Sequence, residues 1–119
     1  MKKTKYIFTK DDLKEKFERF NKAYFHGKMK TPKFKINSWG TCYAGSFFWD
    51  DDGTPYISLS KSGRQKMTEE KVDRVLLHEM IHYYCEGYLG IKFWLFLTHG
   101  PLFQLIRIHL NLKYGLHIK

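Results

Sequence analysis

The sequence predicts a single α+β domain in which a helix and a β-hairpin precede a buried central helix and a closing helix. Its 119 residues, 43% of them hydrophobic, suffice for one core and leave no room for a second. Apolar residues recur at helical spacing near the start and in the second half of the chain, whereas apolar and polar residues alternate between these regions. We therefore expect residues 1–119 to form one domain.

Residues 10–25 are predicted to form the first helix. Thr9 is a favourable N-cap residue, and the acidic residues after it suit the positive end of the helix dipole. Large apolar side chains then recur at helical spacing: Leu13, Phe17, Phe20 and Tyr24. His26 and Gly27 are expected to end this helix.

Three short strands are predicted after the first helix. Residues 33–37 alternate between polar and apolar, as is typical of a half-buried strand. A second strand is expected over residues 41–49, and alternation resumes at 55–60, beyond the turn sequence at 50–53. The last two strands should form a β-hairpin, with Pro55 at the start of its strand or on a sheet edge.

The second helix is predicted to be the buried centre of the domain. Thr68 is a suitable N-cap residue, and the helix should run to about residues 84–86, before Gly87. Apolar residues cover most of its circumference, which is typical of a helix without a solvent-exposed face. An aromatic-rich connection should follow at residues 87–98.

A third helix is predicted to begin at Pro101, which suits the first helical position, and to end at Gly115. One of its sides is expected to face the core. That side comprises Leu102, Leu105, Ile106, His109 and Leu110.

The positive charge of the chain is concentrated at its beginning. The formal net charge is +9, and residues 1–36 hold 12 Lys and Arg against 4 Asp and Glu. Such a segment attracts polyanions, nucleic acid above all, through non-specific contacts with phosphates. A solvated, lysine-rich surface explains the same composition equally well. Non-specific DNA binding is therefore one of two interpretations of this segment.

The two cysteines, Cys42 and Cys85, lie far apart and belong to no CxxC pair. This spacing predicts neither a disulfide framework nor a zinc ribbon, and it favours a reducing compartment. The apolar run near the N-terminus is too short for a signal peptide, and the run at 93–97 is too short to span a membrane. We expect a cytoplasmic monomer without membrane contacts.

The predicted central helix carries an HExxH pattern, formed by His78, Glu79 and His82. The two histidines lie one turn apart on one face, so they can share a tetrahedral Zn2+ ion. Glu79 is displaced by about 100° around the axis, close enough to reach a water on the metal, and it would act as the acid/base of a hydrolysis reaction. The alternative is a core histidine pair hydrogen-bonded to main-chain carbonyls.

A catalytic zinc site needs a third ligand and an open position. Glu86 lies about 12 Å along the helix axis from His78 and cannot share its ion, and Cys85 fails similarly. His99 is the best remaining candidate, because it follows a connection long enough to fold back and directly precedes a helix; its alternative is a capping or loop histidine. The other histidines are expected on the surface, for His26 and His117, or in the core, for His109.

Two segments, LLHEMIHY at 76–83 and HGPLF at 99–103, resemble the SprT/Spartan family of zinc metallopeptidases, whose pattern is HExxH followed by HGxxF. The segments FNKAYF at 20–25 and ISLS at 57–60 also resemble that family, so the resemblance covers about residues 10–110. It implies that the zinc ligands are His78, His82 and His99, that Glu79 is catalytic, and that Phe103 packs to hold the His99 loop.

The resemblance implies a minimal zincin-like fold, with an N-terminal helix and a small antiparallel sheet packed on the HExxH helix, followed by a C-terminal helix. A protein or peptide substrate would run extended along a sheet edge. In eukaryotic members the activity is DNA-dependent cleavage of proteins crosslinked to DNA. The 119 residues contain no zinc ribbon and only a short insert between the motifs, so only the basic N-terminal third is expected to contact DNA.

Two other functions fit the same residues. One is a basic nucleic-acid-binding module with a structural or vestigial zinc site, whose function Glu79→Gln would leave intact. The other is a zinc hydrolase of a non-peptide substrate, because HExxH indicates hydrolysis more firmly than it indicates the bond cleaved. Glu86 is either a partner of the site or solvated.

Overall fold

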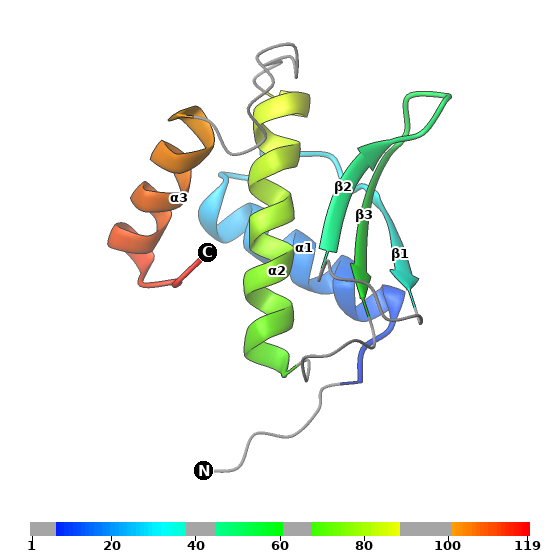
Figure 1. Ribbon diagram of the computed structural model, residues 1–119, viewed down its shortest axis with the longest axis horizontal. Coiled ribbons are helices and arrows are strands. Elements are labelled where there is room, and N and C mark those ends of the chain that lie inside the picture. The colour runs from blue at the N-terminus through cyan, green and yellow to red at the C-terminus, as the bar shows by residue number, and fades with distance from the viewer. Residues whose placement is uncertain (1–6, 38–44, 61–67, 89–100) are drawn as a thin grey trace.

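The computed structural model describes residues 7–37, 45–60, 68–88 and 101–119 of the chain (Figure 1). Helix α2 lies at the centre, with the sheet on one side of it and α3 on the other (Figure 1). The elements, in chain order, are α1 (Lys10–Tyr24), β1 (Lys33–Asn37), β2 (Gly45–Trp49), β3 (Pro55–Ser60), α2 (Glu69–Tyr83), the π-helical turn η1 (Tyr84–Tyr88) and α3 (Pro101–Tyr114). The predicted α+β class is confirmed.

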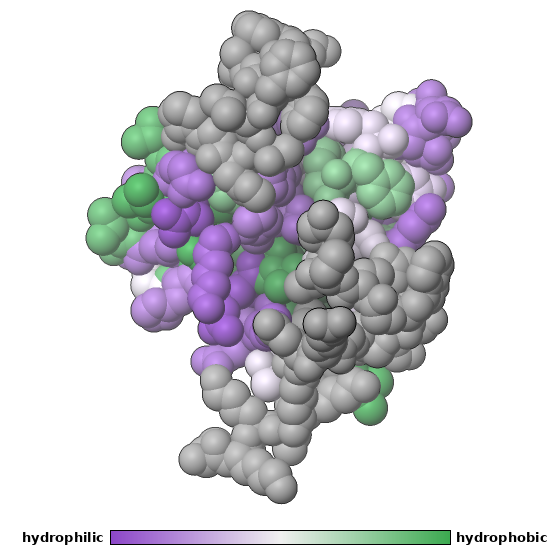
Figure 2. All heavy atoms as spheres, viewed as in Figure 1, coloured by the Kyte–Doolittle hydropathy of each residue, from purple (hydrophilic) through white to green (hydrophobic). Residues whose placement is uncertain are grey.

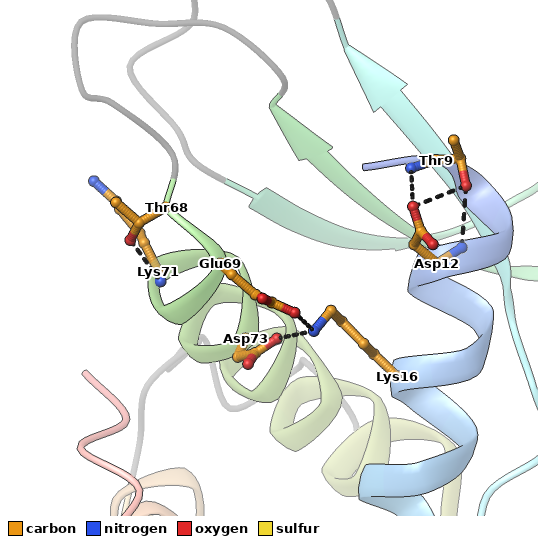
Figure 3. A network of polar contacts seen from close by, with 7 residues as sticks. All are labelled: Thr9, Asp12, Lys16, Thr68, Glu69, Lys71 and Asp73. Atoms are coloured by element: carbon orange, nitrogen blue, oxygen red, sulfur yellow. Dashed lines mark hydrogen bonds and ion pairs between the residues drawn. The ribbon is translucent and has the colours of Figure 1, made fainter. Parts of the chain in front are cut away.

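Helix α1 begins with the predicted cap. The main-chain N–H of Asp12 donates to Thr9 Oγ1 at 3.2 Å, and the main-chain N–H of Thr9 donates to Asp12 Oδ2 at 2.8 Å (Figure 3). This reciprocal pair satisfies N–H groups that have no partner within the helix. The helix ends at Tyr24, and His26 and Gly27 both take positive φ, at 57° and 68°.

The sheet is mixed, so the prediction of an antiparallel sheet is wrong for β1. The strand order is β1-β3-β2, with β2 antiparallel to β3 as the hairpin predicted, but with β1 parallel to β3. Alternation along residues 33–37 indicates which side chains face the core, but it does not encode the neighbouring strand or its direction. Pro55 is the first residue of the central strand, where it costs no sheet hydrogen bond.

Helix α2 is buried on most of its surface, as predicted, and it packs against both other helices and two strands. Its buried apolar residues are Val72, Leu76, Leu77, Met80, Ile81 and Tyr83. Thr68 caps it through a hydrogen bond from the N–H of Lys71 (Figure 3). The helix does not stop before Gly87, because η1 continues through it; a β-carbon at Gly87 would meet the Tyr83 ring at 2.7 Å, so glycine serves close packing here.

A buried lysine joins α1 to the first turns of α2. The ammonium of Lys16 donates to Glu69 Oε2 at 2.8 Å and lies 2.8 Å from Asp73 Oδ1 (Figure 3). Only the Glu69 contact has hydrogen-bond geometry; the contact with Asp73 is an ion pair without a directed N–H. Glu69 is exposed and Asp73 is partly exposed, although the Asp73 oxygen beside the ammonium is buried, so two acids neutralise the buried lysine.

Helix α3 turns only part of the predicted side to the core, since Leu102, Ile106 and Leu110 pack there. Phe103 and Leu110 are buried, whereas Leu105 is 66% exposed and His109 is also exposed. The predictions for Leu105 and His109 are therefore wrong. Apolar residues occur on two sides of this helix, and the helical period alone does not decide which side packs. The outer side carries an exposed apolar row, visible on the left of Figure 2, made of Leu105, Ile108 and Leu112.

Candidate metal and catalytic site

His78 and His82 lie one turn apart on α2, with ring centroids separated by 5.0 Å. Both side chains are half-buried, so their imidazoles are held by protein on one side and can be approached from the other. Two imidazoles at this separation on one helix face can turn a nitrogen each toward a single ion. The HExxH spacing thus places the two imidazoles side by side, while their role as metal ligands stays a prediction.

Phe103 of α3 packs on both imidazoles. Its ring centroid lies 4.9 Å from that of His78 and 4.6 Å from that of His82, and the side chain is buried. An aromatic ring against both imidazoles restricts their rotation about χ2 and excludes water from that side. The family resemblance implies that Phe103 packs against the His99 loop, which lies outside the described residues. Among the described residues, its ring packs on the two helix histidines.

The other nitrogen of His78 has a main-chain partner. Nδ1 of His78 lies 2.5 Å from the main-chain oxygen of Lys119, in the segment that follows α3. An oxygen of this kind only accepts, so Nδ1 is the nitrogen that donates, and in the neutral imidazole the lone pair then lies on Nε2. A core histidine could make the same contact, but metal-bound histidines commonly donate their second N–H to a main-chain carbonyl.

Glu79 lies on the sheet side of α2 and is only 6% exposed. Burial raises the pKa of its carboxyl from 4.5 to about 7. The loss of hydration that causes this shift would be offset by a cation nearby. The two imidazoles are nitrogen donors of the kind that Zn2+ takes, and the desolvated carboxyl beside them is a group that a bound cation would favour in its charged form.

Gly45, the first residue of β2, approaches α2 closely enough to exclude any side chain. A β-carbon there would lie 2.7 Å from Val75 Cγ1, 3.1 Å from the Ser58 carbonyl oxygen and 3.4 Å from Glu79 Oε2. Because Cβ contacts below about 3 Å force movement, a side chain at this position would push β2 away from Val75 of α2, and with it from the neighbouring Glu79 carboxyl. Gly45 is not among the site residues that the sequence predicts; its one local signal is a glycine within the strand predicted at 41–49.

Glu86 and Cys85 lie on η1, beyond the histidine pair. The indole N–H of Trp49 donates to Glu86 Oε1 at 3.4 Å, so Glu86 contacts the end of β2. Burial raises the pKa of the Glu86 carboxyl, and the Trp49 contact partly offsets this. Cys85 is buried, and burial raises the pKa of its thiol to about 11. A thiol of this kind is not a ready metal ligand at neutral pH.

The remaining candidate ligands are of two kinds. His26 and His117 are exposed and have positive φ, which confirms that they are surface residues. His99 and Cys42 lie outside the described residues. Within the described ranges, no three His, Cys, Asp or Glu side chains come together as a metal-binding group. The third ligand predicted at His99 therefore stays a prediction.

The comparisons with known proteins agree with the resemblance drawn from the HExxH and HGPLF segments. Residues 13–118 match the SprT-like family. No curated protein sequence matches the chain. Among the described residues, no helix is both long enough and apolar enough to cross a membrane.

Proposed function

Because the chain belongs to the SprT-like family, we propose that it is a cytoplasmic zinc-dependent endopeptidase whose metal is held by His78, His82 and His99. The observation that carries this proposal is the arrangement on α2, where two half-buried imidazoles 5.0 Å apart flank a carboxyl that is 6% exposed. An ionisable group buried beside two candidate ligand side chains costs stability, so its position there favours a catalytic use.

Glu79 is proposed to move the proton during peptide hydrolysis. When bound, zinc supplies a Lewis acid that polarises the scissile carbonyl and activates water. The Glu79 carboxylate takes a proton from the attacking water and passes it to the leaving nitrogen. Phe103 keeps the two imidazoles oriented and shielded from water on the α3 side.

The substrate is proposed to bind as an extended strand along the outer edge of β2. Within the part of the chain that the structure describes, β2 pairs with β3 alone, and no described strand pairs with its other edge, where an added strand is proposed to bind. Alternate residues of β2 face α2: Gly45 lies beside Glu79, while Phe47 and Trp49 lie against Tyr83. The strand edge therefore runs from the catalytic carboxyl past an aromatic surface that suits apolar side chains of a peptide.

Proteins bound or crosslinked to DNA are the proposed substrate class, with the basic N-terminal third as the DNA contact. Exposed lysines line the approach to β1 and the strand itself: Lys28, Lys30, Lys33 and Lys35. The Lys35 ammonium lies 4.9 Å from the Tyr56 ring and 5.3 Å from the Phe48 ring, which stack on each other. Cations beside stacked aromatic rings suit single-stranded nucleic acid, which contacts proteins through phosphates and bases.

The test combines metal analysis with cleavage of casein and of a protein crosslinked to DNA, each with and without single-stranded DNA. We expect one zinc per chain and cleavage that Glu79→Gln abolishes while zinc stays bound. Glu15→Gln, on the exposed side of α1, controls for the loss of a negative charge. DNA binding that Glu79→Gln leaves intact, with no cleavage by the wild type, would instead support the nucleic-acid-binding module.

A further inference from the structure

The residues after α3 fold back along that helix and reach α2. The helix ends where the N–H of Gly115 donates to the Asn111 carbonyl oxygen at 2.8 Å. Gly115 and His117 then take positive φ, at 66° and 59°, which reverses the direction of the chain. The end of this segment lies beside the middle of α2 (Figure 1).

Asn111 fastens the segment through both atoms of its side-chain amide. Its Oδ1 accepts from the N–H of Ile118 at 2.7 Å, and its Nδ2 donates to the Ile118 carbonyl oxygen at 2.9 Å. Arg107 Nη1 donates to the same carbonyl at 3.2 Å. The Ile118 side chain is buried in the core at 1% exposure. Three hydrogen bonds and a buried side chain therefore fix the main chain one residue before Lys119.

This anchoring places the Lys119 oxygen against His78. The contact with Nδ1, at 2.5 Å, is the last link of a chain that runs from Asn111 through Ile118 to Lys119. Lys119 is exposed, and the contact uses its main-chain oxygen, so the side chain is not required. The segment is thus built to present an acceptor to one ring nitrogen of one histidine.

We propose that the segment 115–119, anchored by Asn111, is a positioning element that holds His78 in the tautomer with its proton on Nδ1, so that Nε2 is the atom offered to the metal. This role rests on the proposed function, because the orientation of His78 matters only if its Nε2 binds zinc. A hydrogen bond to the second nitrogen also fixes the plane of the imidazole and raises its basicity as a ligand.

The test compares a variant that lacks Lys119 with Lys119→Ala, which keeps the main-chain oxygen and removes only the side chain. Zinc affinity is measured by competition with a chelating dye, and the tautomer of His78 by nitrogen NMR of the metal-free protein. We expect Lys119→Ala to behave as the wild type. The truncated variant should bind zinc about 10- to 100-fold more weakly and lose the preference for a proton on Nδ1.

Asn111→Ala provides an independent route to the same result, because it releases the segment without shortening the chain. It should shift the tautomer and weaken zinc binding in the same direction. Denaturation midpoints identify a variant that has merely unfolded. A truncated, folded protein with unchanged zinc affinity and an unchanged Nδ1 proton would overturn the proposal. A wild type that binds no zinc refutes the proposed function instead, while the tautomer of the metal-free protein still decides whether the segment orients His78.

Discussion

The substitution Glu79→Gln should stabilise the metal-free protein while it abolishes catalysis. Glu79 is 6% exposed, and burial raises its pKa from 4.5 to about 7. The unfolded state therefore ionises this carboxyl at a lower pH than the folded state does. As the pH rises from about 4.5 to about 7, ionisation favours the unfolded state and the wild type loses stability; above pH 7 the loss is complete. Glutamine keeps the size of the side chain but does not ionise.

The size of the effect follows from the difference between the two pKa values. At about 1.4 kcal/mol per pH unit, a pKa of about 7 in place of 4.5 corresponds to about 3 kcal/mol. We therefore expect Glu79→Gln to raise the free energy of unfolding by about 3 kcal/mol at pH 8, relative to the wild type. At pH 4.5 the carboxyl is protonated in the folded state and half-protonated in the unfolded state, so the difference should fall below about 0.5 kcal/mol.

The measurement is urea denaturation of both proteins with a metal chelator present, at pH 4.5, 6 and 8. Glu15→Gln, at an exposed position of α1, serves as the matched control and should show no comparable gain at pH 8. If Glu79→Gln changes stability by the same amount at all three pH values, or destabilises the protein at pH 8, then burial does not raise the pKa of this carboxyl.

Three further substitutions test the surroundings of the site. Gly45→Ala places a methyl group 2.7 Å from Val75 Cγ1, so it should cost about 1–3 kcal/mol of stability. Casein cleavage should fall about tenfold. Adding Val75→Ala, which makes room for the methyl group, should recover much of both losses. Phe103→Leu removes the ring that packs on both imidazoles, so zinc affinity in a chelator competition should fall about tenfold, and unchanged affinity would show that the ring is only core packing. Lys16→Met removes the ammonium that pairs with Asp73 and should lower the unfolding free energy by about 1 kcal/mol without altering activity per folded molecule; an equal loss of activity would mean that the two helices position the site together.

The parts of the fold that the sequence predicted well are those that depend on neighbours along the chain. The caps at Thr9 and Thr68, the turn that closes the hairpin, and the buried length of α2 each rest on residues within a few positions of one another. The direction of β1 depends instead on which edge of β3 it joins, and the alternation at 33–37 is the same for either choice. Similarly, the side of α3 that packs depends on the shape of α2, since α3 is apolar on two sides.

In the candidate site, too, the contacts that are local in sequence were predictable and the distant ones were not. The arrangement of His78, Glu79 and His82 follows from helix geometry, so five residues of sequence sufficed to predict it. Gly45 approaches Glu79 across 34 positions of sequence, and the Lys119 oxygen reaches His78 across 41. Neither contact has a local pattern, because a glycine at a strand start and a main-chain oxygen look the same in sequence wherever they lie. Only the fold brings them to the site.

The two sides of α2 control different properties of the proposed enzyme. On the α3 side, Phe103 and the main-chain oxygen of Lys119 contact the imidazoles, so changes there should act on metal affinity. On the sheet side, Gly45 lies near the carboxyl, and the proposed substrate edge is that of β2, so changes there should act on turnover and substrate binding. Phe103→Leu should therefore lower zinc affinity while leaving kcat per bound zinc nearly unchanged. Gly45→Ala should lower kcat per bound zinc while leaving zinc affinity nearly unchanged. If both variants lose the two properties together, α2 responds as one rigid unit and this division does not hold.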